Sequence, residues 1–386
     1  MEVVAVELRR LELDLVRPLA TSRGVHGRRP VVLVRLDTDL GVGWGECEAL
    51  AAPTYTEEHA DAAEAVLADH LVPMLLAAPH PFAGAADALG MLDAVRGHQM
   101  AKAAIEMALL DAELRAAGQS LAHRIGATRP TVVAGATVGD GPPAAAVREV
   151  AAALDDGIGH VKCKVASGRG IAHVREVRSS FPDLSMSVDA NGSYRLEREA
   201  DRAALQVLDG LALSAIEQPL APDDLVGHAV LVSELETCVV LDESICTLGQ
   251  LDTALALRAC GGVSVKAARL GGVLAAVALR DRCAAAGVRL LAGGMLEAGL
   301  GRATALAVAA LDGVDLPGDL GPSERYFSPD LTAPHVLRDG RIAVPDVPGI
   351  GATVRLDVVE SLTVRTVTFP SRRTPDQRFV ASRSPA

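Results

Sequence analysis

A repeated unit of about 25 residues fills the second half of the chain and limits the folds that it can form. In each unit a short apolar run is followed by a turn and by an alanine-rich helical stretch. The charged residues that end successive runs lie 24 to 28 residues apart. Such alternation is typical of βα units that share a parallel sheet. The seven apolar runs span residues 132–138, 160–165, 185–189, 213–217, 238–242, 263–266 and 289–293.

Seven such units, with an eighth apolar run at residues 314–316, predict an α/β protein with a (β/α)7–8 barrel of the TIM type over residues 130–325. An open, doubly wound sheet is the alternative fold. The chain has no G-x-G-x-x-G sequence directly after any of these runs. The chain therefore lacks the sequence signature of the dinucleotide-binding form of this alternative fold.

The residues before the repeat predict a second, smaller α+β domain. Residues 1–129 start with strand-like runs and continue with helical patterns at residues 56–76 and 99–117, the second of which ends at Gly118. A polar, glycine-containing stretch at residues 21–29 separates the first two strands. We predict that this stretch is a mobile loop.

The C-terminal part of the chain departs from the repeat again. Asp339-Gly340 lies between two short strand-like stretches, which is a strong hairpin signal, and residues 354–368 are rich in β-branched side chains. We expect residues 326–369 to fold back onto the N-terminal domain. Residues 370–386 are rich in serine, proline and arginine and are predicted to be a disordered tail.

Composition and charge narrow the range of functions. A net charge of −12 argues against a nucleic-acid partner, and the apolar runs are too short to span a membrane. The six cysteines are scattered without a C-x-x-C pair, so we expect neither a disulfide framework nor a zinc site. These features predict a cytoplasmic protein.

Three carboxylates mark the ends of consecutive apolar runs. Asp189, Glu217 and Asp242 close the third, fourth and fifth strands of the predicted barrel. Because active sites of such barrels lie at the carboxyl ends of the strands, we expect these side chains to converge there. Unpaired carboxylates at short range repel one another, and a bound hard cation removes that repulsion. The sequence therefore predicts a Mg²⁺ site, with Mn²⁺ as the alternative ion.

Lysines flank this cluster of carboxylates. Lys162 and Lys164 are two residues apart on the second strand, so their side chains share one face, and Lys266 ends the sixth strand. Strands two and six lie on opposite sides of a barrel mouth, so Lys164 and Lys266 are predicted to face one substrate from two directions. A lysine acts as a base only when its pKa is lowered. We expect Lys162 to lower the pKa of Lys164, and Arg269 that of Lys266.

These residue types together point to one class of reaction. A divalent cation that binds a substrate carboxylate stabilises the enediolate left when the α-proton is removed. A neutral lysine beside it accepts that proton. We therefore predict proton abstraction α to the carboxylate of a small-molecule substrate, followed by elimination or by reprotonation.

Several short motifs at the predicted strand ends and in the N-terminal segment carry a family resemblance. The motifs are Lys162-Cys-Lys164, Val188-Asp-Ala-Asn191, Ile216-Glu-Gln-Pro219, Leu241-Asp-Glu-Ser244, Val265-Lys266 and Gly43-Trp-Gly-Glu46. They resemble motifs of the enolase superfamily, in its muconate-lactonizing subgroup. The resemblance covers nearly the whole chain and implies that the N-terminal and C-terminal segments form one α+β domain that caps the barrel. Two further motifs, Gly293-Gly-Met-Leu-Glu-Ala-Gly-Leu-Gly-Arg302 and Leu316-Pro-Gly-Asp319, resemble those of o-succinylbenzoate synthases and N-acylamino acid racemases.

The resemblance also implies roles for particular residues. It implies that Asp189, Glu217 and Asp242 bind Mg²⁺, that Lys164 removes the α-proton, and that Lys266 stabilises the enediolate or serves as a second base. The supporting residues implied are Lys162, Asn191, Glu243 and Arg269. The substrate-binding residues implied are Ser22 and Arg23 in a loop that closes over the substrate, together with Gly293 and Met295.

The resemblance leaves three activities open. The leading hypothesis is o-succinylbenzoate synthase, a dehydration in menaquinone biosynthesis, followed by N-acylamino acid racemase and then by a muconate-type cycloisomerase. The chain departs from its nearest relatives at residues 166–170, at Ala267-Ala268 and at Ala298, beside the substrate pocket. These departures leave the substrate open. The resemblance also implies a homo-oligomer.

Overall fold

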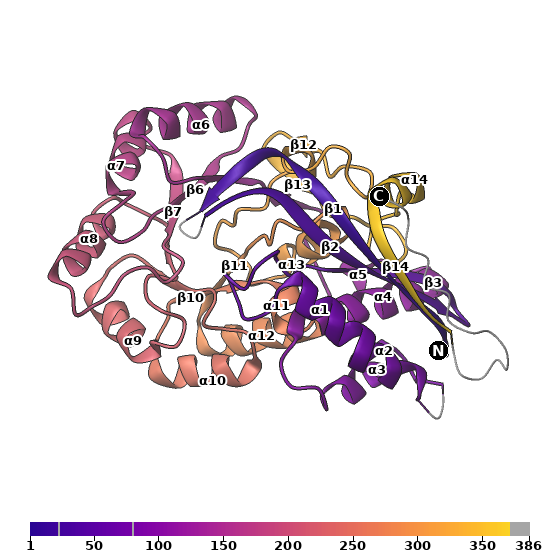
Figure 1. The fold of residues 1–386 in the computed structure, drawn as a ribbon. Coiled ribbons are helices and arrows are strands. Elements are labelled where there is room, and N and C mark those ends of the chain that lie inside the picture. The colour runs from indigo at the N-terminus through magenta and orange to yellow at the C-terminus, as the bar shows by residue number, and fades with distance from the viewer. Residues whose placement is uncertain (22–23, 79–80, 371–386) are drawn as a thin grey trace.

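The computed structural model of the chain describes residues 1–21, 24–78 and 81–370. Its two parts are a curled parallel sheet wrapped by helices and an antiparallel sheet with helices packed against it (Figure 1). The first part is the predicted barrel and the second is the predicted capping domain. Ser22 and Arg23, and the predicted tail from residue 371 onward, lie outside the described residues.

Seven parallel strands form the barrel in the order β11-β10-β9-β8-β7-β6-β5, so each strand pairs with its neighbour along the chain. The strands are β5 (Gly135–Val138), β6 (His160–Lys164), β7 (Ser185–Asp189), β8 (Ile216–Glu217), β9 (Val239–Leu241), β10 (Gly262–Val265) and β11 (Arg289–Ala292). The helices are α6 (Pro143–Asp155), α7 (Ile171–Ser180), α8 (Glu199–Asp209), α9 (Leu225–Glu234), α10 (Leu248–Leu257), α11 (Ala267–Leu270), α12 (Val273–Ala286) and α13 (Gly299–Ala309).

An extended segment, and not an eighth strand, closes the gap between β11 and β5. Val314 forms a single bridge with Leu290, and the Leu316 amide donates to the Leu290 carbonyl at 2.9 Å. On the other side the Gly135 amide donates to the Leu320 carbonyl at 3.0 Å. The eighth apolar run therefore completes the ring without becoming a regular strand of the sheet.

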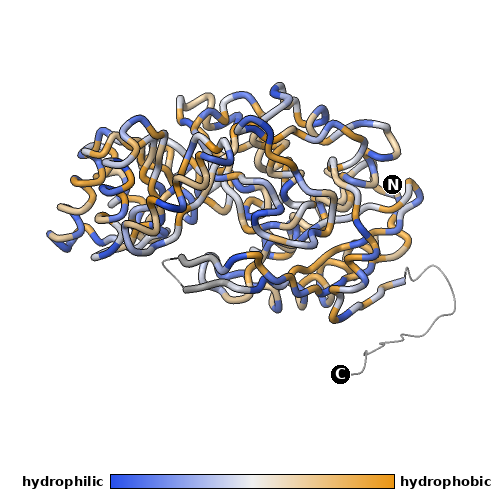
Figure 2. Tube along the Cα trace, turned by 90° about the horizontal axis from the view of Figure 1, so that it is seen from above, coloured by the Kyte–Doolittle hydropathy of each residue, from blue (hydrophilic) through white to orange (hydrophobic). Residues whose placement is uncertain are grey.

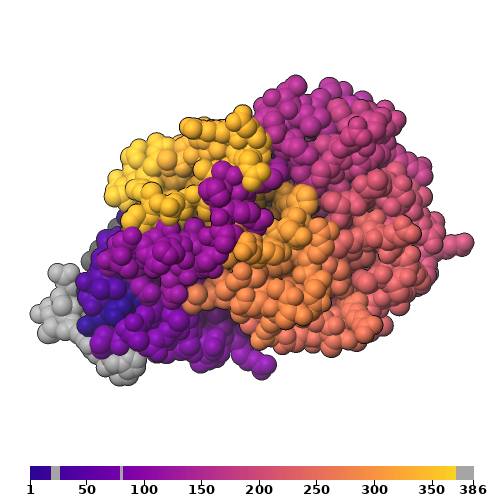
Figure 3. Space-filling view, turned by 180° about the vertical axis from the view of Figure 1, so that it is seen from behind, coloured from indigo at the N-terminus to yellow at the C-terminus, as the bar shows by residue number. Residues whose placement is uncertain are grey.

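The capping domain is built on a four-stranded sheet in the order β14-β1-β2-β3. Strand β14 belongs to the C-terminal segment and pairs antiparallel with β1, as expected for a segment that returns to the N-terminal domain. Figure 3 shows this segment, in yellow, lying against the purple N-terminal elements. The strands are β1 (Val3–Thr21), β2 (Gly24–Thr38), β3 (Gly41–Cys47) and β14 (Thr363–Pro370). The helical segments are α1 (Ala60–Val66), η1 (Leu67–Leu71), α2 (Val72–Leu76), α3 (Ala85–Leu92), α4 (Gln99–Ala117) and α5 (Leu121–Arg124).

Helix α4 packs directly on β3 because two glycines of the Gly43-Trp-Gly-Glu46 motif leave room for it. A Cβ atom on Gly45 would lie 2.0 Å from the Ala104 carbonyl oxygen, and one on Gly43 would lie 1.9 Å from that of Ala108. The helix is buried on nearly every side, and Figure 2 shows apolar residues along the long strands of the capping sheet. This close contact fixes the end of β3, where Glu46 lies.

Three local predictions were wrong. Residues 132–138 form two strands of different sheets, since β4 (Thr131–Val133) joins a small antiparallel sheet with β12 (Leu337–Arg338) and β13 (Arg341–Ala343) around the predicted hairpin. Residues 354–368 contain α14 (Leu356–Leu362) before β14 begins.

The third concerns residues 21–29, where the loop predicted between the first two strands is much shorter than expected. Strand β1 continues to Thr21 and β2 starts at Gly24, because their ladder continues past a register shift to the Thr21–Gly24 pair.

Two predictions from composition can be checked on this fold. All six cysteines are free thiols, in agreement with the absence of a disulfide framework. Within the described part of the chain, none of the helices combines the length and the apolar character that a membrane crossing requires.

Candidate active site

The three predicted carboxylates lie at the carboxyl edge of the barrel sheet. Asp189 ends β7 and Glu217 ends β8, and these two residues are direct neighbours across the sheet. Asp242 follows β9 immediately. All three side chains are at most 1% exposed. The strand ends thus bring together residues that are 53 positions apart in the chain, as predicted.

Cationic side chains lie between these carboxylates. The Lys162 Nζ atom is 3.0 Å from a Glu217 oxygen and 3.4 Å from an Asp189 oxygen. The Lys164 Nζ atom is 2.6 Å from Asp189 Oδ2 and donates to Asn191 Oδ1 at 3.0 Å. In residues 1–21, 24–78 and 81–370, no group of three or more His, Cys, Asp or Glu side chains is arranged to hold a metal ion. Ion pairs with Lys162 and Lys164 thus offset the negative charges of Asp189 and Glu217 in this structure.

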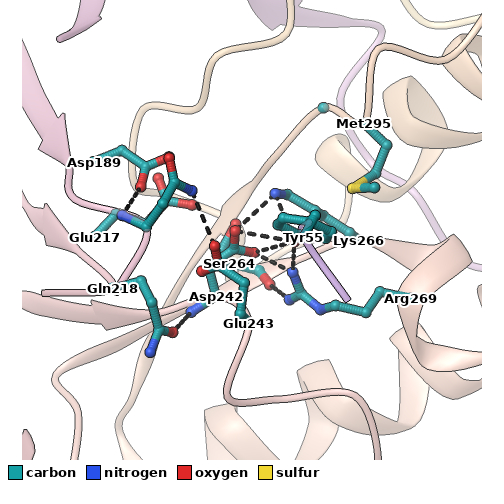
Figure 4. Close-up of polar contacts among 12 residues, drawn as sticks. Tyr55, Asp189, Glu217, Gln218, Asp242, Glu243, Ser264, Lys266, Arg269 and Met295 are labelled. Carbon is teal, nitrogen blue, oxygen red and sulfur yellow. Dashed lines mark hydrogen bonds and ion pairs between the residues drawn. The ribbon is translucent and has the colours of Figure 1, made fainter. Parts of the chain in front are cut away.

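Asp242 has its own set of partners on the opposite side of the site (Figure 4). Lys266 Nζ donates to Asp242 Oδ2 at 2.9 Å, and the Arg269 guanidinium donates to Asp242 Oδ1. The Tyr55 hydroxyl lies 3.0 Å from both Asp242 oxygens and from Lys266 Nζ. Gln218 holds the backbone of Asp242, because the Gln218 Oε1 atom accepts from the Asp242 amide at 2.8 Å.

These contacts set the pKa of each group. Burial opposes a charged Lys266, but the Asp242 carboxylate raises the pKa of this lysine above its usual value. Arg269 acts to lower the pKa of Lys266, as expected, but the Asp242 carboxylate outweighs this effect and the net shift is upward. Burial likewise opposes a charged Asp242, yet Arg269 and Lys266 hold its pKa far below the usual range.

Glu217 carries the feature that fits a bound cation. Burial, together with the neighbouring charges of Asp189 and Asp242, raises the pKa of Glu217 to about 7. Its Oε1 atom is buried and has no hydrogen-bond partner among the described residues. A buried carboxylate oxygen without a donor is costly unless a cation faces it. The donor set of Asp189, Glu217 and Asp242 is all oxygen, which suits Mg²⁺ or Mn²⁺.

A cavity of about 810 Å³ opens above this cluster. Lys164 and Lys266 both line it, so the two lysines reach the same space from β6 and from the end of β10. The other predicted residues on its wall are Lys162, Asp189, Asn191 and Met295. Val16, Arg17 and Pro18 of β1 and Tyr55 also line it, so the capping domain supplies part of the wall.

The other predicted residues that the structure describes do not line the cavity. Glu243 is buried, and Asn191 Nδ2 donates to its Oε1 atom at 3.0 Å. Gly293 was predicted to bind substrate, but it does not line the cavity. A Cβ atom at Gly293 would lie 2.5 Å from Lys266 Cε and 2.8 Å from Ser264 Oγ. The glycine therefore makes room for the Lys266 side chain.

Sequence reasoning assigned no role to three residues that complete the site. Gln218 and Asp319 stand inside motifs that are visible in the sequence, and Asp319 Oδ2 lies 2.9 Å from Lys162 Nζ. Tyr55 lies outside any strand or helix of the capping domain and carries no local signal. The scarcity of lysine is a further sequence signal for the location of the site, although it does not identify these three residues. The chain has only four lysines, and three of them are in this site.

Two family models match the chain, and together they cover both structural parts. The mandelate racemase / muconate lactonizing enzyme N-terminal domain matches residues 5–126, and the enolase C-terminal domain-like family matches residues 145–358. The chain therefore belongs to the enolase superfamily and is an enzyme of its mandelate racemase and muconate-lactonizing group, as the motifs predicted.

Similar proteins span nearly the whole chain. An N-succinylamino acid racemase from an Amycolatopsis species is 41% identical over 369 residues, which cover 95% of this chain and 99% of that protein. An o-succinylbenzoate synthase from Geobacillus stearothermophilus is 39% identical over 363 residues, covering 93% and 95%. A crystal structure of an enolase superfamily member from Listeria innocua is 34% identical and superposes with a TM-score of 0.91, covering 96% of this chain and all of that one.

Proposed function

We propose that this enzyme removes the proton α to a substrate carboxylate with the help of Mg²⁺, or alternatively Mn²⁺, and dehydrates its substrate to o-succinylbenzoate. The observation that carries the proposal is the pair of lysines, Lys164 and Lys266, on one cavity above three buried carboxylates. The similarity to o-succinylbenzoate synthases over more than nine tenths of the chain supports this choice of reaction.

Asp189, Glu217 and Asp242 would hold the divalent ion. When bound, it supplies positive charge that stabilises the enediolate formed on the substrate carboxylate. Binding also gives the Glu217 Oε1 atom the electrostatic partner that it lacks among the described residues.

Lys164 is proposed to accept the α-proton. Asp189 and Asn191 hold its amino group at the cavity wall, which fixes its position relative to the substrate. The same lysine, once protonated, then donates that proton to the departing hydroxyl group, which leaves as water. Lys266 faces the substrate from the other side, and its ammonium group stabilises the negative charge that develops.

Racemisation of N-succinylamino acids is the second candidate. It requires a proton acceptor on one face of the α-carbon and a proton donor on the other, and we assign these roles to Lys164 and Lys266, which both line the cavity. The 41% identity to an N-succinylamino acid racemase supports it further. Both reactions share the first step, so one active site is able to perform both.

The substitution Lys266→Arg separates the two reactions. Arginine keeps the positive charge but does not lose its proton near neutral pH, so dehydration should persist at about a tenth of the wild-type rate or more, whereas racemisation should fall by about 10³-fold. We would measure both reactions with Mg²⁺, together with exchange of the α-proton in D₂O. Equal losses of the two reactions would contradict the assignment of Lys266. Absence of wild-type turnover on the dehydration substrate and on a panel of N-succinylamino acids would refute the proposed function.

The substitution Gly293→Ala tests the placement of Lys266. The added methyl group would displace Lys266 Cε, and a misplacement of about 1 Å in an active site can cost about 10²-fold in rate. We expect a loss of this size in racemisation. The neighbouring Gly294→Ala is the comparison, because its Cβ atom would come no closer than 3.5 Å to any other group and should cause a much smaller loss. Equal effects of both variants would show that close contact with Lys266 does not matter.

A further inference from the structure

The loop that follows β11, residues 293–298, forms part of the cavity wall and has few hydrogen bonds to the rest of the barrel backbone. Met295 and Leu296 line the cavity, and Leu296 has a positive φ of 57°, a conformation that a leucine rarely adopts. Such a conformation persists only when its surroundings hold it in place. The question is which residues hold this loop.

Carboxylate side chains accept the amide groups of this loop and of the helix that follows it. Gly294 donates to Asp319 at 3.1 Å, Met295 to Glu297 at 2.5 Å, and Gly299 to Asp330 at 2.9 Å. Asp319 lies in the barrel and Asp330 in the C-terminal segment, whereas Glu297 belongs to the loop itself. The wall is therefore held by ionisable side chains, and not by a regular backbone ladder.

The capping sheet provides two further contacts. Glu46, at the end of β3, is fully buried and accepts from Ala298 at 2.8 Å and from Gly301 at 3.0 Å, so it caps the start of α13 with both oxygens. Arg29, on β2, is 2% exposed, and its Nε atom donates to the Leu296 carbonyl. Its Nη1 atom donates to the Ala49 carbonyl at 3.2 Å, which ties the guanidinium to its own domain.

We propose that Glu46 and Arg29 are positioning residues through which the capping domain sets the place of the Met295–Leu296 wall and thereby selects substrates by size. This inference rests on the proposed function for the nature of the substrate. It assigns specificity to two buried residues that do not line the cavity. Neither residue is expected to take part in proton transfer.

The test compares Glu46→Gln and Arg29→Lys with the wild type. Glutamine keeps one acceptor oxygen but replaces the other with a donor, so the amides of Ala298 and Gly301 should exchange with D₂O about tenfold faster or more, measured by mass spectrometry on a peptide that covers residues 293–301. The KM for N-succinylphenylalanine relative to N-succinylalanine should change by about fivefold or more, with a smaller change in kcat. Arg29→Lys should change this KM ratio to the same extent, but exchange of the Gly301 amide should stay at the wild-type rate.

Glu106→Gln is the matched control. Glu106 lies on α4 of the capping domain, is 2% exposed, and accepts from Val273 and Leu274 at the start of α12, away from the cavity. Burial raises the pKa of both Glu46 and Glu106 to about 7, and both accept backbone amides at the start of a barrel helix. Glu106→Gln should lower the Tm to a similar extent and leave both the KM ratio and exchange at residues 293–301 unchanged.

Two results would overturn the inference. One is a Glu46→Gln variant whose exchange at residues 293–301 matches that of the wild type or is reproduced by Glu106→Gln. The other is faster exchange together with an unchanged KM ratio, which would leave Glu46 a purely structural role. If the wild type turns over none of these substrates, the proposed function fails, and the exchange measurement alone decides whether Glu46 holds the wall.

Discussion

The substitution Lys164→Ala should lower kcat by about 10²–10⁴-fold on every substrate that the enzyme accepts, because it removes the group that we propose as the acceptor of the α-proton. Exchange of the α-proton in D₂O should fall to the same extent, since it reports the proton transfer itself. The loss should appear in both the dehydration and the racemisation assays. This shared loss would separate Lys164 from Lys266, for which we propose that the positive charge alone suffices in dehydration.

The control for this experiment is the fourth lysine of the chain. Lys102 is also buried, at 8% exposed, and its Nζ atom donates to the Val95 carbonyl at 2.5 Å in the capping domain, outside the cavity. Lys102→Ala should lower the Tm and leave kcat within about twofold of the wild type. If Lys164→Ala kept the wild-type rate while remaining folded, proton abstraction by this lysine would be excluded.

The substitution Glu217→Gln should abolish Mg²⁺-dependent activity, with a loss of about 10³-fold or more. The substitution replaces the Glu217 carboxylate with an amide, which is a weaker ligand for Mg²⁺, and leaves only two of the three proposed carboxylate ligands. Calorimetric titration with Mg²⁺ should show affinity reduced by at least about 10²-fold. Treatment of the wild type with a chelator should reproduce the loss of activity, and added Mg²⁺ should restore it.

Glu106→Gln again serves as the matched control, since it removes a buried carboxylate that lies away from the cavity. It should bind Mg²⁺ with wild-type affinity. A Glu217→Gln variant that titrates with Mg²⁺ as the wild type does would exclude Glu217 as a ligand. A wild type that retains full activity in the chelator would exclude the metal itself.

Asp189, Glu217 and Asp242 show which part of the site the sequence alone predicts. Each residue ends a short apolar run, and parallel strands of one sheet present their carboxyl ends at the same edge. Their common location was therefore predictable from spacing. The partners of Asp242 were not, because Lys266, Arg269 and Tyr55 share its two oxygens, and Tyr55 reaches them only through the packing of the capping domain on the barrel.

Gly293 shows that a sequence motif does not reveal why a glycine is required. The family resemblance implied that Gly293, in the glycine-rich motif after the seventh predicted strand, binds substrate. The structure shows that the glycine is needed because Lys266 from the neighbouring strand occupies the space where a Cβ atom would lie. A glycine in a sequence signals close approach but does not identify the group that approaches.

By itself the sequence determined the barrel, the returning C-terminal strand, the family and the edge at which acidic and basic side chains meet. These features follow from local patterns whose period and end residues are read along one stretch of chain. Only the tertiary structure decided that Tyr55 contacts Asp242, 187 positions away, and that Glu46 caps a helix that starts more than 250 positions later. Contacts at such separations depend on how two domains pack, and packing is set by the complementary shapes of many side chains at once.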